Sequence, residues 1–225
     1  MGTGWVIAPG LVVTNRHVLE EFAAPLPRLD NPDSWQIYRD TRIDFSPGAD
    51  DPAQSFAVTG VAFAGAQPIR LYPISFDKLD LAVLRVEPVN DAGTPLPPPL
   101  PIAAGNAAQG LNLFALGYPA PPGYIPRDEH GQMRQDVIER LRDIFGLTYR
   151  RKYFSPGLVM GPSNAWVFDH DATTLGGNSG SLVGTLSGGL WAVGLHFAGD
   201  WLRANHAHDL RAVLTARPEL AALLP

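Results

Sequence analysis

The chain has 225 residues, of which 45% are hydrophobic and 17% are charged, so it can bury a core and does not belong to the disordered class. Its formal net charge of -5 argues against a nucleic-acid partner, because such proteins need a basic face to neutralise phosphates. The absence of cysteine excludes a disulfide framework, a thiolate nucleophile and a cysteine-ligated zinc site.

The first residues enter a strand pattern directly, without a basic, apolar, cleavable leader. No apolar run is long enough to span a bilayer, so we expect no membrane partner. The lack of cysteine fits a reducing compartment. We therefore expect either a cytoplasmic protein or a domain of a longer chain, and the abrupt start within a strand favours the second.

Short apolar segments separated by turn residues predict an all-β fold. Residues 4–8 and 11–15 flank Pro9-Gly10 and predict a hairpin. Alternating or continuous apolar patterns predict further strands at residues 56–63, 79–86, 111–116, 181–186 and 190–197.

Two segments have the periodicity of helices. Residues 133–145 place their apolar side chains on one face and are followed by Gly146, a helix stop signal. Residues 209–224 are rich in alanine and leucine but contain Pro218, which predicts two short pieces of helix. Residues 91–101 are rich in proline and predict a stiff connector near mid-chain.

The sharpest chemical signal is the segment Gly176-Gly177-Asn178-Ser179-Gly180-Ser181. A serine among small residues has an exposed hydroxyl, and the glycines let backbone N–H groups converge on one point. Two such donors can hold the negative oxygen that forms when a carbonyl is attacked. Alone, the segment could equally be a glycine-rich turn.

Two further residues suit the same chemistry. His17 follows an apolar strand, where a histidine can face a cleft. Asp80 lies inside the apolar stretch 79–84, and a buried acid there needs a hydrogen-bonding partner. The ring N–H of His17 would be a suitable one, and the alternative is an aspartate facing water at a strand end.

The order histidine, aspartate, serine in these three contexts resembles the trypsin/chymotrypsin-type serine proteases. Residues 14–18 resemble the family's histidine motif, with Val18 where animal members carry cysteine, and residues 80–84 resemble the aspartate motif. Residues 177–181 resemble the serine motif, with Asn178 in place of the usual aspartate and Ser181 in place of the second glycine. The asparagine form is similar to bacterial members, including the high-temperature-requirement proteases and the glutamyl endopeptidases.

The resemblance implies a serine endopeptidase that acts on proteins or peptides without a cofactor or metal. Ser179 would be the nucleophile, His17 the general base and Asp80 the residue that orients the histidine. The backbone at Gly177, Asn178 and Ser179 would form the oxyanion hole. The implied fold is two packed six-stranded antiparallel barrels, residues 1–95 and 96–225, with a helical insertion at about 120–153 and a C-terminal helix.

The departures from the family pattern suggest how the site is controlled and what it accepts. Because Asn178 is not a carboxylate, activation by an inserted N-terminal ammonium should not operate, and the site is preformed or is switched by a loop, another domain or a partner. Thr173 stands where a basic preference would need an acid, although Asp171 is near. The substrate pocket would comprise Thr173, Thr174, His196 and Phe197, and Thr174 with His196 resembles the glutamate-binding pair of the glutamyl endopeptidases. This resemblance implies a preference for acidic residues.

Three other interpretations compete with these. A catalytically silent protease-fold binding module is disfavoured because all three catalytic residues are present. A serine esterase of another fold is disfavoured because the chain lacks a Gly-x-Ser-x-Gly elbow. A metal site is disfavoured because His206 and His208 have no carboxylate cluster beside them in the sequence, and His130 and His170 form no pattern either.

Overall fold

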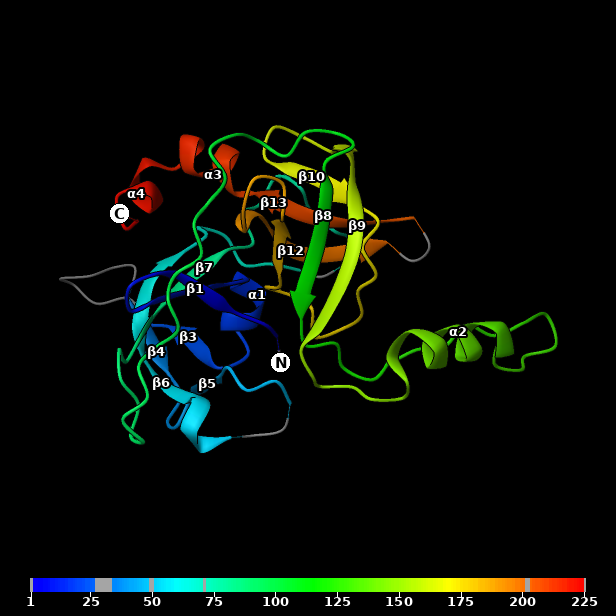
Figure 1. The fold of residues 1–225 in the computed structure, drawn as a ribbon, viewed down its shortest axis with the longest axis horizontal. Coiled ribbons are helices and arrows are strands. Elements are labelled where there is room, and N and C mark those ends of the chain that lie inside the picture. Colours follow the sequence, from blue (N-terminus) through cyan, green and yellow to red (C-terminus); the bar gives the residue numbers. More distant parts are fainter. Residues whose placement is uncertain (1, 27–33, 49–50, 71, 201–202, 225) are drawn as a thin grey trace.

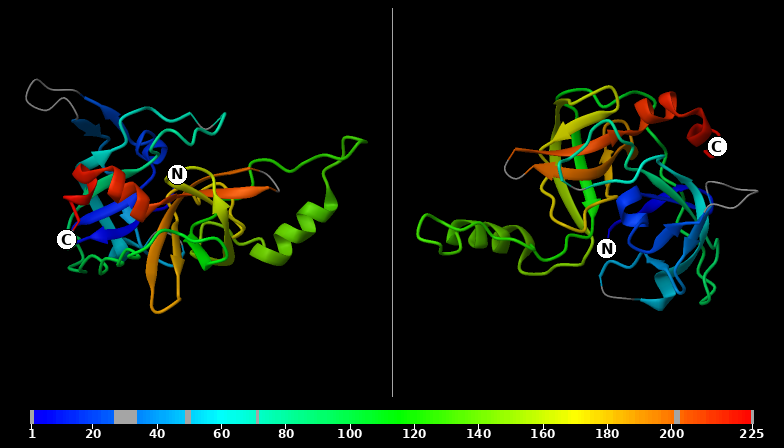
Figure 2. Two further views of the ribbon diagram at one scale, coloured as in Figure 1. Left: turned by 90° about the horizontal axis from the view of Figure 1, so that it is seen from above. Right: turned by 180° about the vertical axis from the view of Figure 1, so that it is seen from behind.

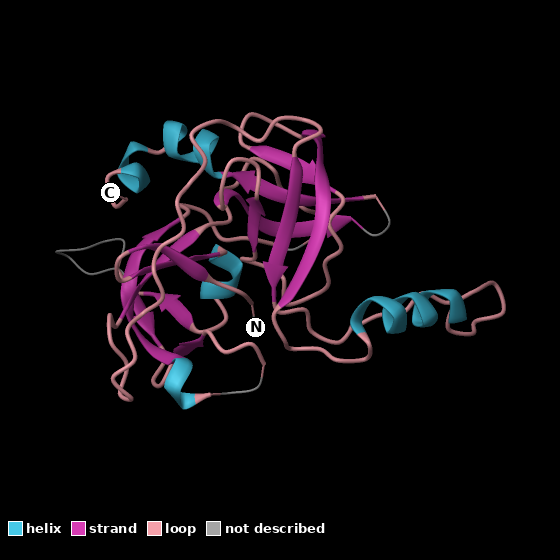
Figure 3. Ribbon diagram, in the orientation of Figure 1, coloured by secondary structure: helices cyan, strands magenta, loops and turns pink. Residues whose placement is uncertain are grey.

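A computed structural model describes residues 2–26, 34–48, 51–70, 72–200 and 203–224. The strands form two groups that lie side by side, and most helices lie at the edges or project outward, whereas one short helix near the N-terminus lies between the two groups (Figures 1 and 3). Within the described part of the chain, no helix is both long and apolar enough to cross a membrane. The expected all-β double-barrel architecture is confirmed in outline.

The first half is a curled five-stranded antiparallel sheet in the order β1-β2-β7-β6-β5, and a separate two-stranded sheet pairs β3 with β4. In place of the expected closed six-stranded barrel, the described residues therefore form an open sheet and a hairpin-like pair. The predicted hairpin around Pro9-Gly10 is confirmed, with Val6 paired to Val12. The strands are β1 (Trp5–Ala8), β2 (Leu11–Thr14), β3 (Ala23–Pro25), β4 (Trp35–Ile37), β5 (Arg42–Asp44), β6 (Ser55–Ala64) and β7 (Ala82–Val86).

The second half is a closed barrel in the order β10-β13-β12-β11-β8-β9. Its interior contains small and branched apolar side chains, including Val159, Val183 and Val193 around Phe168. The strands are β8 (Asn112–Gly117), β9 (Tyr153–Pro162), β10 (Val167–His170), β11 (Leu182–Thr185), β12 (Trp191–Asp200) and β13 (Ala204–Asp209).

One hydrophobic cluster joins the two halves. It combines Trp5 and Val13 of the first sheet with Phe114 and Leu195 of the barrel and with Leu210 of the C-terminal helix. Burial of apolar area at about 25 cal/mol per Å² makes such a shared core the main force that fixes the halves against each other. The junction between them is therefore a rigid place to build a site.

Helices are few. The predicted insertion helix is present as α2 (Gln135–Phe145), which ends at Gly146 in the left-handed conformation and projects from the barrel (Figures 1 and 2). The predicted pair of short C-terminal helices is present as α3 (Leu210–Ala216) and α4 (Pro218–Ala221). A short helix α1 (Arg16–Leu19) and a 3-10 turn η1 (Pro52–Gln54) complete the fold.

Candidate active site

His17 and Asp80 form a hydrogen-bonded pair in the first half. His17 lies on α1, immediately after β2, and Asp80 precedes β7 by two residues instead of lying within the strand. The Nδ1 of His17 is 2.6 Å from Oδ2 of Asp80, and the backbone N–H of His17 donates to Oδ1 over 2.9 Å. Since a carboxylate only accepts, the ring proton belongs on Nδ1, and Nε2 is left as a free base.

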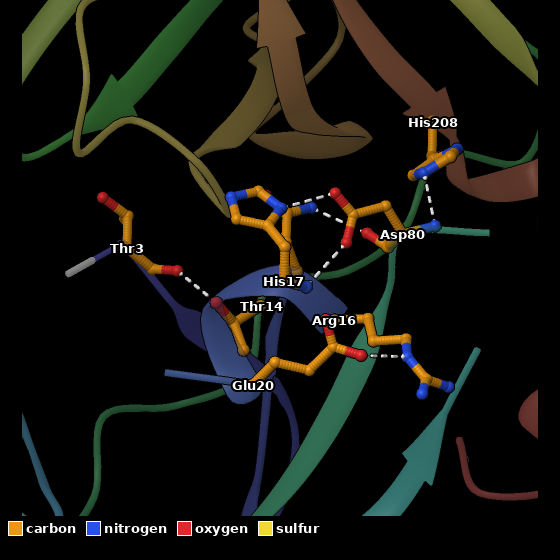
Figure 4. Close-up of polar contacts among 8 residues, drawn as sticks. Thr3, Thr14, Arg16, His17, Glu20, Asp80 and His208 are labelled. Atoms are coloured by element: carbon orange, nitrogen blue, oxygen red, sulfur yellow. Dashed lines mark hydrogen bonds and ion pairs between the residues drawn. The ribbon is translucent and has the colours of Figure 1, made fainter. Parts of the chain in front are cut away.

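All four polar groups of Asp80 have a partner (Figure 4). Besides the two bonds to His17, the Asp80 carbonyl accepts from Nδ2 of Asn15 over 2.8 Å. The Asp80 backbone N–H donates to Nε2 of His208 over 3.0 Å. Asp80 is only 2% exposed, and this complete pairing offsets the free-energy cost of burying its carboxylate.

His208 is a support for Asp80 that comes from the other half of the molecule. It lies on β13, is fully buried and stacks on Phe197 with ring centroids 4.3 Å apart. Burial lowers the pKa of His208 from 6.5 to about 4, so its ring is neutral near pH 7. Its Nε2 accepts from Asp80, which places the single ring proton on Nδ1.

Ser179 lies in the turn before β11. Each backbone carbonyl from residue 176 to residue 179 accepts a hydrogen bond. The carbonyl of Gly176 accepts from the N–H of Ala120 over 2.7 Å. That of Gly177 accepts from the hydroxyl of Thr3 over 2.8 Å. The carbonyls of residues 178 and 179 accept from the N–H groups of Ser181 (2.8 Å) and Thr3 (2.7 Å).

These contacts orient the two predicted oxyanion donors. In a planar trans peptide the N–H points opposite to the carbonyl of the preceding residue. Fixing the carbonyls of Gly176 and Asn178 therefore fixes the directions of the N–H groups of Gly177 and Ser179. Neither of these N–H groups donates to a described residue, so both remain available to a ligand.

Two glycines let the chain take this path. Gly177 has φ +90°, and a Cβ there would lie 2.5 Å from the carbonyl oxygen of Tyr118. Gly180 has φ +84°, and a Cβ there would lie 2.0 Å from the carbonyl oxygen of Thr3. Both positions need glycine for conformation and for space.

The N-terminal segment brings the turn of Ser179 to the helix of His17. A Cβ on Gly2 would lie 2.4 Å from a methyl group of Val18 and 3.0 Å from the carbonyl oxygen of Ser179, so both stand next to the same point. Among the described residues, neither Ser179 Oγ nor His17 Nε2 has a hydrogen-bond partner. The turn of Ser179 and the helix that carries His17 thus lie next to the same residue, Gly2, and the hydroxyl and the ring nitrogen both bond to no described residue.

Asn178 is bonded within its own turn. Its Nδ2 donates to the carbonyl of Leu175 over 3.2 Å, and its Oδ1 accepts from the hydroxyl of Ser181 over 3.1 Å. Asn178 is only 5% exposed. The turn is therefore closed by local bonds.

The predicted pocket residues are placed in different ways. Thr173 is half-buried and its hydroxyl bonds to no described residue. The hydroxyl of Thr174 donates to Oδ1 of Asn205 over 2.6 Å. The ring of Phe197 packs against His208.

His196 lies beside the turn of Ser179. Its carbonyl accepts from the N–H of Gly180 (2.9 Å), and its own N–H donates to the carbonyl of Ser181 (3.0 Å). Its Nδ1 is 3.2 Å from Nε2 of His170, while its Nε2 bonds to no described residue. Burial lowers the pKa of His196 well below 6.5 and that of His170 to about 4, so both rings are neutral near pH 7.

The proton between the two histidines can be assigned from what surrounds them. The Nδ1 of His170 is buried without a partner. Leaving a buried donor unpaired costs more than leaving one lone pair, so His170 carries its proton on Nε2 and donates to His196. His196 then carries its own proton on Nε2, where it is a free donor.

Sequence reasoning missed several residues of this site. Thr3, Asn205 and His208 carry no motif of their own, and β13 was not among the predicted strands. The i, i+2 spacing of His206 and His208 is the signal that could have indicated a buried strand. The described residues contain no group of three or more side chains that could hold a metal ion. His206 is instead paired with Asp169 at 2.7 Å.

Comparison with known proteins agrees with this geometry. A family model described as trypsin-like peptidase domain matches residues 2–193. A probable serine protease of Lysobacter enzymogenes is 30% identical over 243 residues, which cover 99% of this chain and 59% of that protein. The chain thus spans about three-fifths of the length of this curated relative.

A solved structure of a bacterial protease shows a related fold. The serine endoprotease from Yersinia pestis aligns with a TM-score of 0.55 at 16% identity, over 98% of this chain and 57% of that one. The protease Rv3671c from M. tuberculosis, in an inactive form, aligns over 100% of this chain and 83% of that one, at 20% identity and a TM-score of 0.48.

Proposed function

Because the chain belongs to the family of trypsin-like peptidase domains, we propose that it is a serine endopeptidase in which Ser179, His17 and Asp80 form the catalytic triad. The observation that carries the proposal is the His17–Asp80 pair, in which Nδ1 and Oδ2 are 2.6 Å apart and Nε2 bonds to no described residue. The helix of His17 lies next to Gly2, and so does the turn of Ser179. Two free backbone donors at that turn complete the set of groups that acyl transfer needs.

The reaction follows from these positions. His17 Nε2 takes the proton of Ser179 while Oγ attacks the carbonyl carbon, and the carbonyl oxygen becomes an oxyanion held by the N–H groups of Gly177 and Ser179. His17 then gives the proton to the leaving amine, and the peptide bond breaks to leave an acyl-enzyme. Water repeats the sequence, with His17 as its base, and releases the acid. Asp80 stabilises the imidazolium throughout and keeps its ring in place.

The finer part of the proposal is a preference for an acidic residue at P1, the residue before the cut bond. His196 is the group that supports it, since its backbone flanks the turn of Ser179 and its Nε2–H is a free donor. A neutral donor at the end of a pocket favours a carboxylate or a polar side chain over an apolar one. The sequence pairs Thr174 with His196, but the hydroxyl of Thr174 already donates its hydrogen bond to Oδ1 of Asn205.

We further propose that control of activity comes from outside this turn, through a partner or a neighbouring part of a larger protein. The turn is closed by its own bonds, so an inserted terminus is not required. The carbonyl of Gly176 accepts from the N–H of Ala120, which lies at the base of the α2 insertion. A regulator that moves this insertion would therefore also move the peptide that carries the Gly177 N–H. A silent binding module remains the competing function.

Labelling with a fluorophosphonate probe tests the triad without knowledge of the substrate. Ser179 Oγ should displace fluoride from phosphorus and become covalently labelled, and Ser179→Ala and His17→Ala should not react. A diverse peptide library should then be cut by the native chain and not by Ser179→Ala, whose turnover should fall by about 10⁶-fold. A folded native chain that neither reacts nor cuts would support the binding module instead.

A further inference from the structure

The side chain of Asn205 stands between two segments that carry the predicted pocket residues. The first wall, residues 171–176, contains Thr173 and Thr174, and the second wall, residues 194–199, contains His196 and Phe197. Asn205 lies at the start of β13, paired with His170 of β10 on one side and with Gly199 of β12 on the other. Its Nδ2 donates to the carbonyl of Ala172 over 2.8 Å, and its Oδ1 accepts from Thr174 over 2.6 Å. The amide is therefore bonded to the first wall at two points.

The same amide also touches the second wall. A Cβ built on Gly199 would lie 2.3 Å from Oδ1 of Asn205, so any side chain at position 199 would collide with it. Gly199 is thus the residue whose missing side chain makes room for Asn205. The side chain of Asn205 therefore crosses from one of these two segments to the other.

The chemistry of the contacts leaves one orientation for this amide. The carbonyl of Ala172 only accepts, so it requires the NH₂ group, and the oxygen then faces the hydroxyl of Thr174. Rotating the side chain away would leave both bonds unmade in a partly buried site, which is costly. Asn205 is consequently a fixed obstacle and not a side chain that swings aside for substrate.

We infer that Asn205 is a specificity-determining residue that restricts the P1 pocket to short side chains. Alanine, serine and aspartate should be accepted, whereas glutamate, leucine, phenylalanine and lysine should be rejected. The inference rests on the proposed function, because the pocket has this role only if Ser179 is the nucleophile. Asn205 limits the length of the P1 side chain, whereas His196 sets the preference for its charge. Experiments can test these two properties separately.

A series of peptides identical except at P1 separates them. The ratio of kcat/KM for alanine over phenylalanine, and for aspartate over glutamate, reports pocket length. The ratio for aspartate over asparagine reports the His196 donor alone. We expect the native chain to favour alanine over phenylalanine by at least about 100-fold, since pocket contacts discriminate by factors of roughly 10–200.

Removing the side chain of Asn205 should weaken this preference for short side chains. In Asn205→Gly the ratio of alanine to phenylalanine should fall by about tenfold or more, with the aspartate-to-asparagine ratio unchanged. Asn90→Gly is the matched control, because it removes the same kind of side chain, whose amide donates to the carbonyl of Ala53 over 3.0 Å in the first half of the molecule, and its length preference should stay close to native. An unchanged length preference in a folded Asn205→Gly would overturn the inference, as would a native chain that cuts after phenylalanine as well as after alanine.

A binding measurement covers the case in which no cutting is seen. Product peptides that end in alanine or phenylalanine can be titrated into Ser179→Ala by calorimetry, with and without Asn205→Gly. Tighter binding of the alanine peptide, lost on opening the pocket, supports the inference whatever the catalytic outcome. Equal binding of the two peptides to Ser179→Ala overturns it, and near-UV circular dichroism confirms that each variant is folded.

Discussion

The two sides of the catalytic junction are held in different ways. The His17–Asp80 side is held by side chains, since every polar group of Asp80 bonds to a side chain or backbone group of Asn15, His17 or His208. The Ser179 side is held through backbone carbonyls, each of which has a donor. The difference means that the first side depends on the identity of its polar side chains, whereas the second depends on the path of the chain, which requires glycine at positions 177 and 180.

The largest effect should come from changing the side-chain-held side. In Asp80→Asn the amide oxygen can still accept from the backbone N–H of His17, which turns the NH₂ group toward Nδ1. Nδ1 must then be unprotonated, the ring proton moves to Nε2, and the general base is lost. We expect kcat to fall by about 10⁴-fold with little change in KM, measured on the best library peptide.

The control for this substitution is stability, because the asparagine keeps the size and most bonds of the native side chain. A fall in kcat with a native-like melting temperature would assign the loss to the tautomer. If Asp80→Asn kept near-native turnover, the assignment of Asp80 as the orienting residue would be wrong.

The contrast between the two sides also explains what could be predicted from the sequence. His17, Asp80 and Ser179 were predicted from the sequence because each lies in a recognisable motif and its proposed chemistry depends on its own side chain. Thr3 was not, because it acts by donating to the carbonyls of Gly177 and Ser179, and a single threonine near a glycine gives no pattern that indicates this. Long-range contacts of this kind depend on how the two halves pack.

The fold shows the same limit. Strands with strong apolar runs, such as β7 and β11, were located to within a few residues. β13 was missed because Asn205, His206, His208 and Asp209 make it look polar, although four of its six residues are buried. Its polar groups are paired with Asp80, Asp169 and backbone groups of the barrel, which no local pattern reveals.

Low pH should destabilise the His17–Asp80 side of the site, because His208 supports Asp80 there. Burial lowers the pKa values of His208 and His170 from 6.5 to about 4, so between these values the unfolded chain binds more protons than the folded one. Stability is therefore fully present above about pH 6.5 and is lost as the pH falls toward 4, by roughly 3 kcal/mol for each histidine. Urea unfolding between pH 7.5 and 4 measures the loss.

Two variants assign this acid dependence. His208→Asn keeps an acceptor for the backbone N–H of Asp80 but does not titrate, so the share of the loss due to His208 should disappear while the shares of the buried His170 and His196 remain. His130→Gln should change nothing, because its side chain is 79% exposed. A native-like pH dependence in His208→Asn would contradict the role of His208.

A smaller effect on kcat is expected from Thr3, a single side chain that supports the turn of Ser179. Thr3→Val removes the hydroxyl that donates to Gly177 but keeps the N–H that donates to Ser179. We expect kcat to fall by about tenfold, less than the roughly 10²–10³ that loss of an oxyanion donor costs, with KM nearly unchanged. Thr3→Ser should restore the native rate, and a Thr3→Val rate equal to native would show that the hydroxyl does not position the turn.

The smallest effect on rate is expected from Ser181→Ala, which removes the side-chain bond to Asn178 and leaves the backbone bond between the same two residues. The Asn178 oxygen would be buried without a partner, which should lower the free energy of unfolding by about 1–3 kcal/mol. The peptide between Asn178 and Ser179 would keep its orientation, because Ser181 N–H still donates to the Asn178 carbonyl over 2.8 Å. We therefore expect kcat within about threefold of native while urea unfolding shows the lost stability, since the oxyanion donors are preorganised by backbone bonds. A loss of rate as large as that of Thr3→Val would mean that the Asn178 side chain also sets the oxyanion donors, and the turn would then depend on residue identity as strongly as the His17–Asp80 pair does.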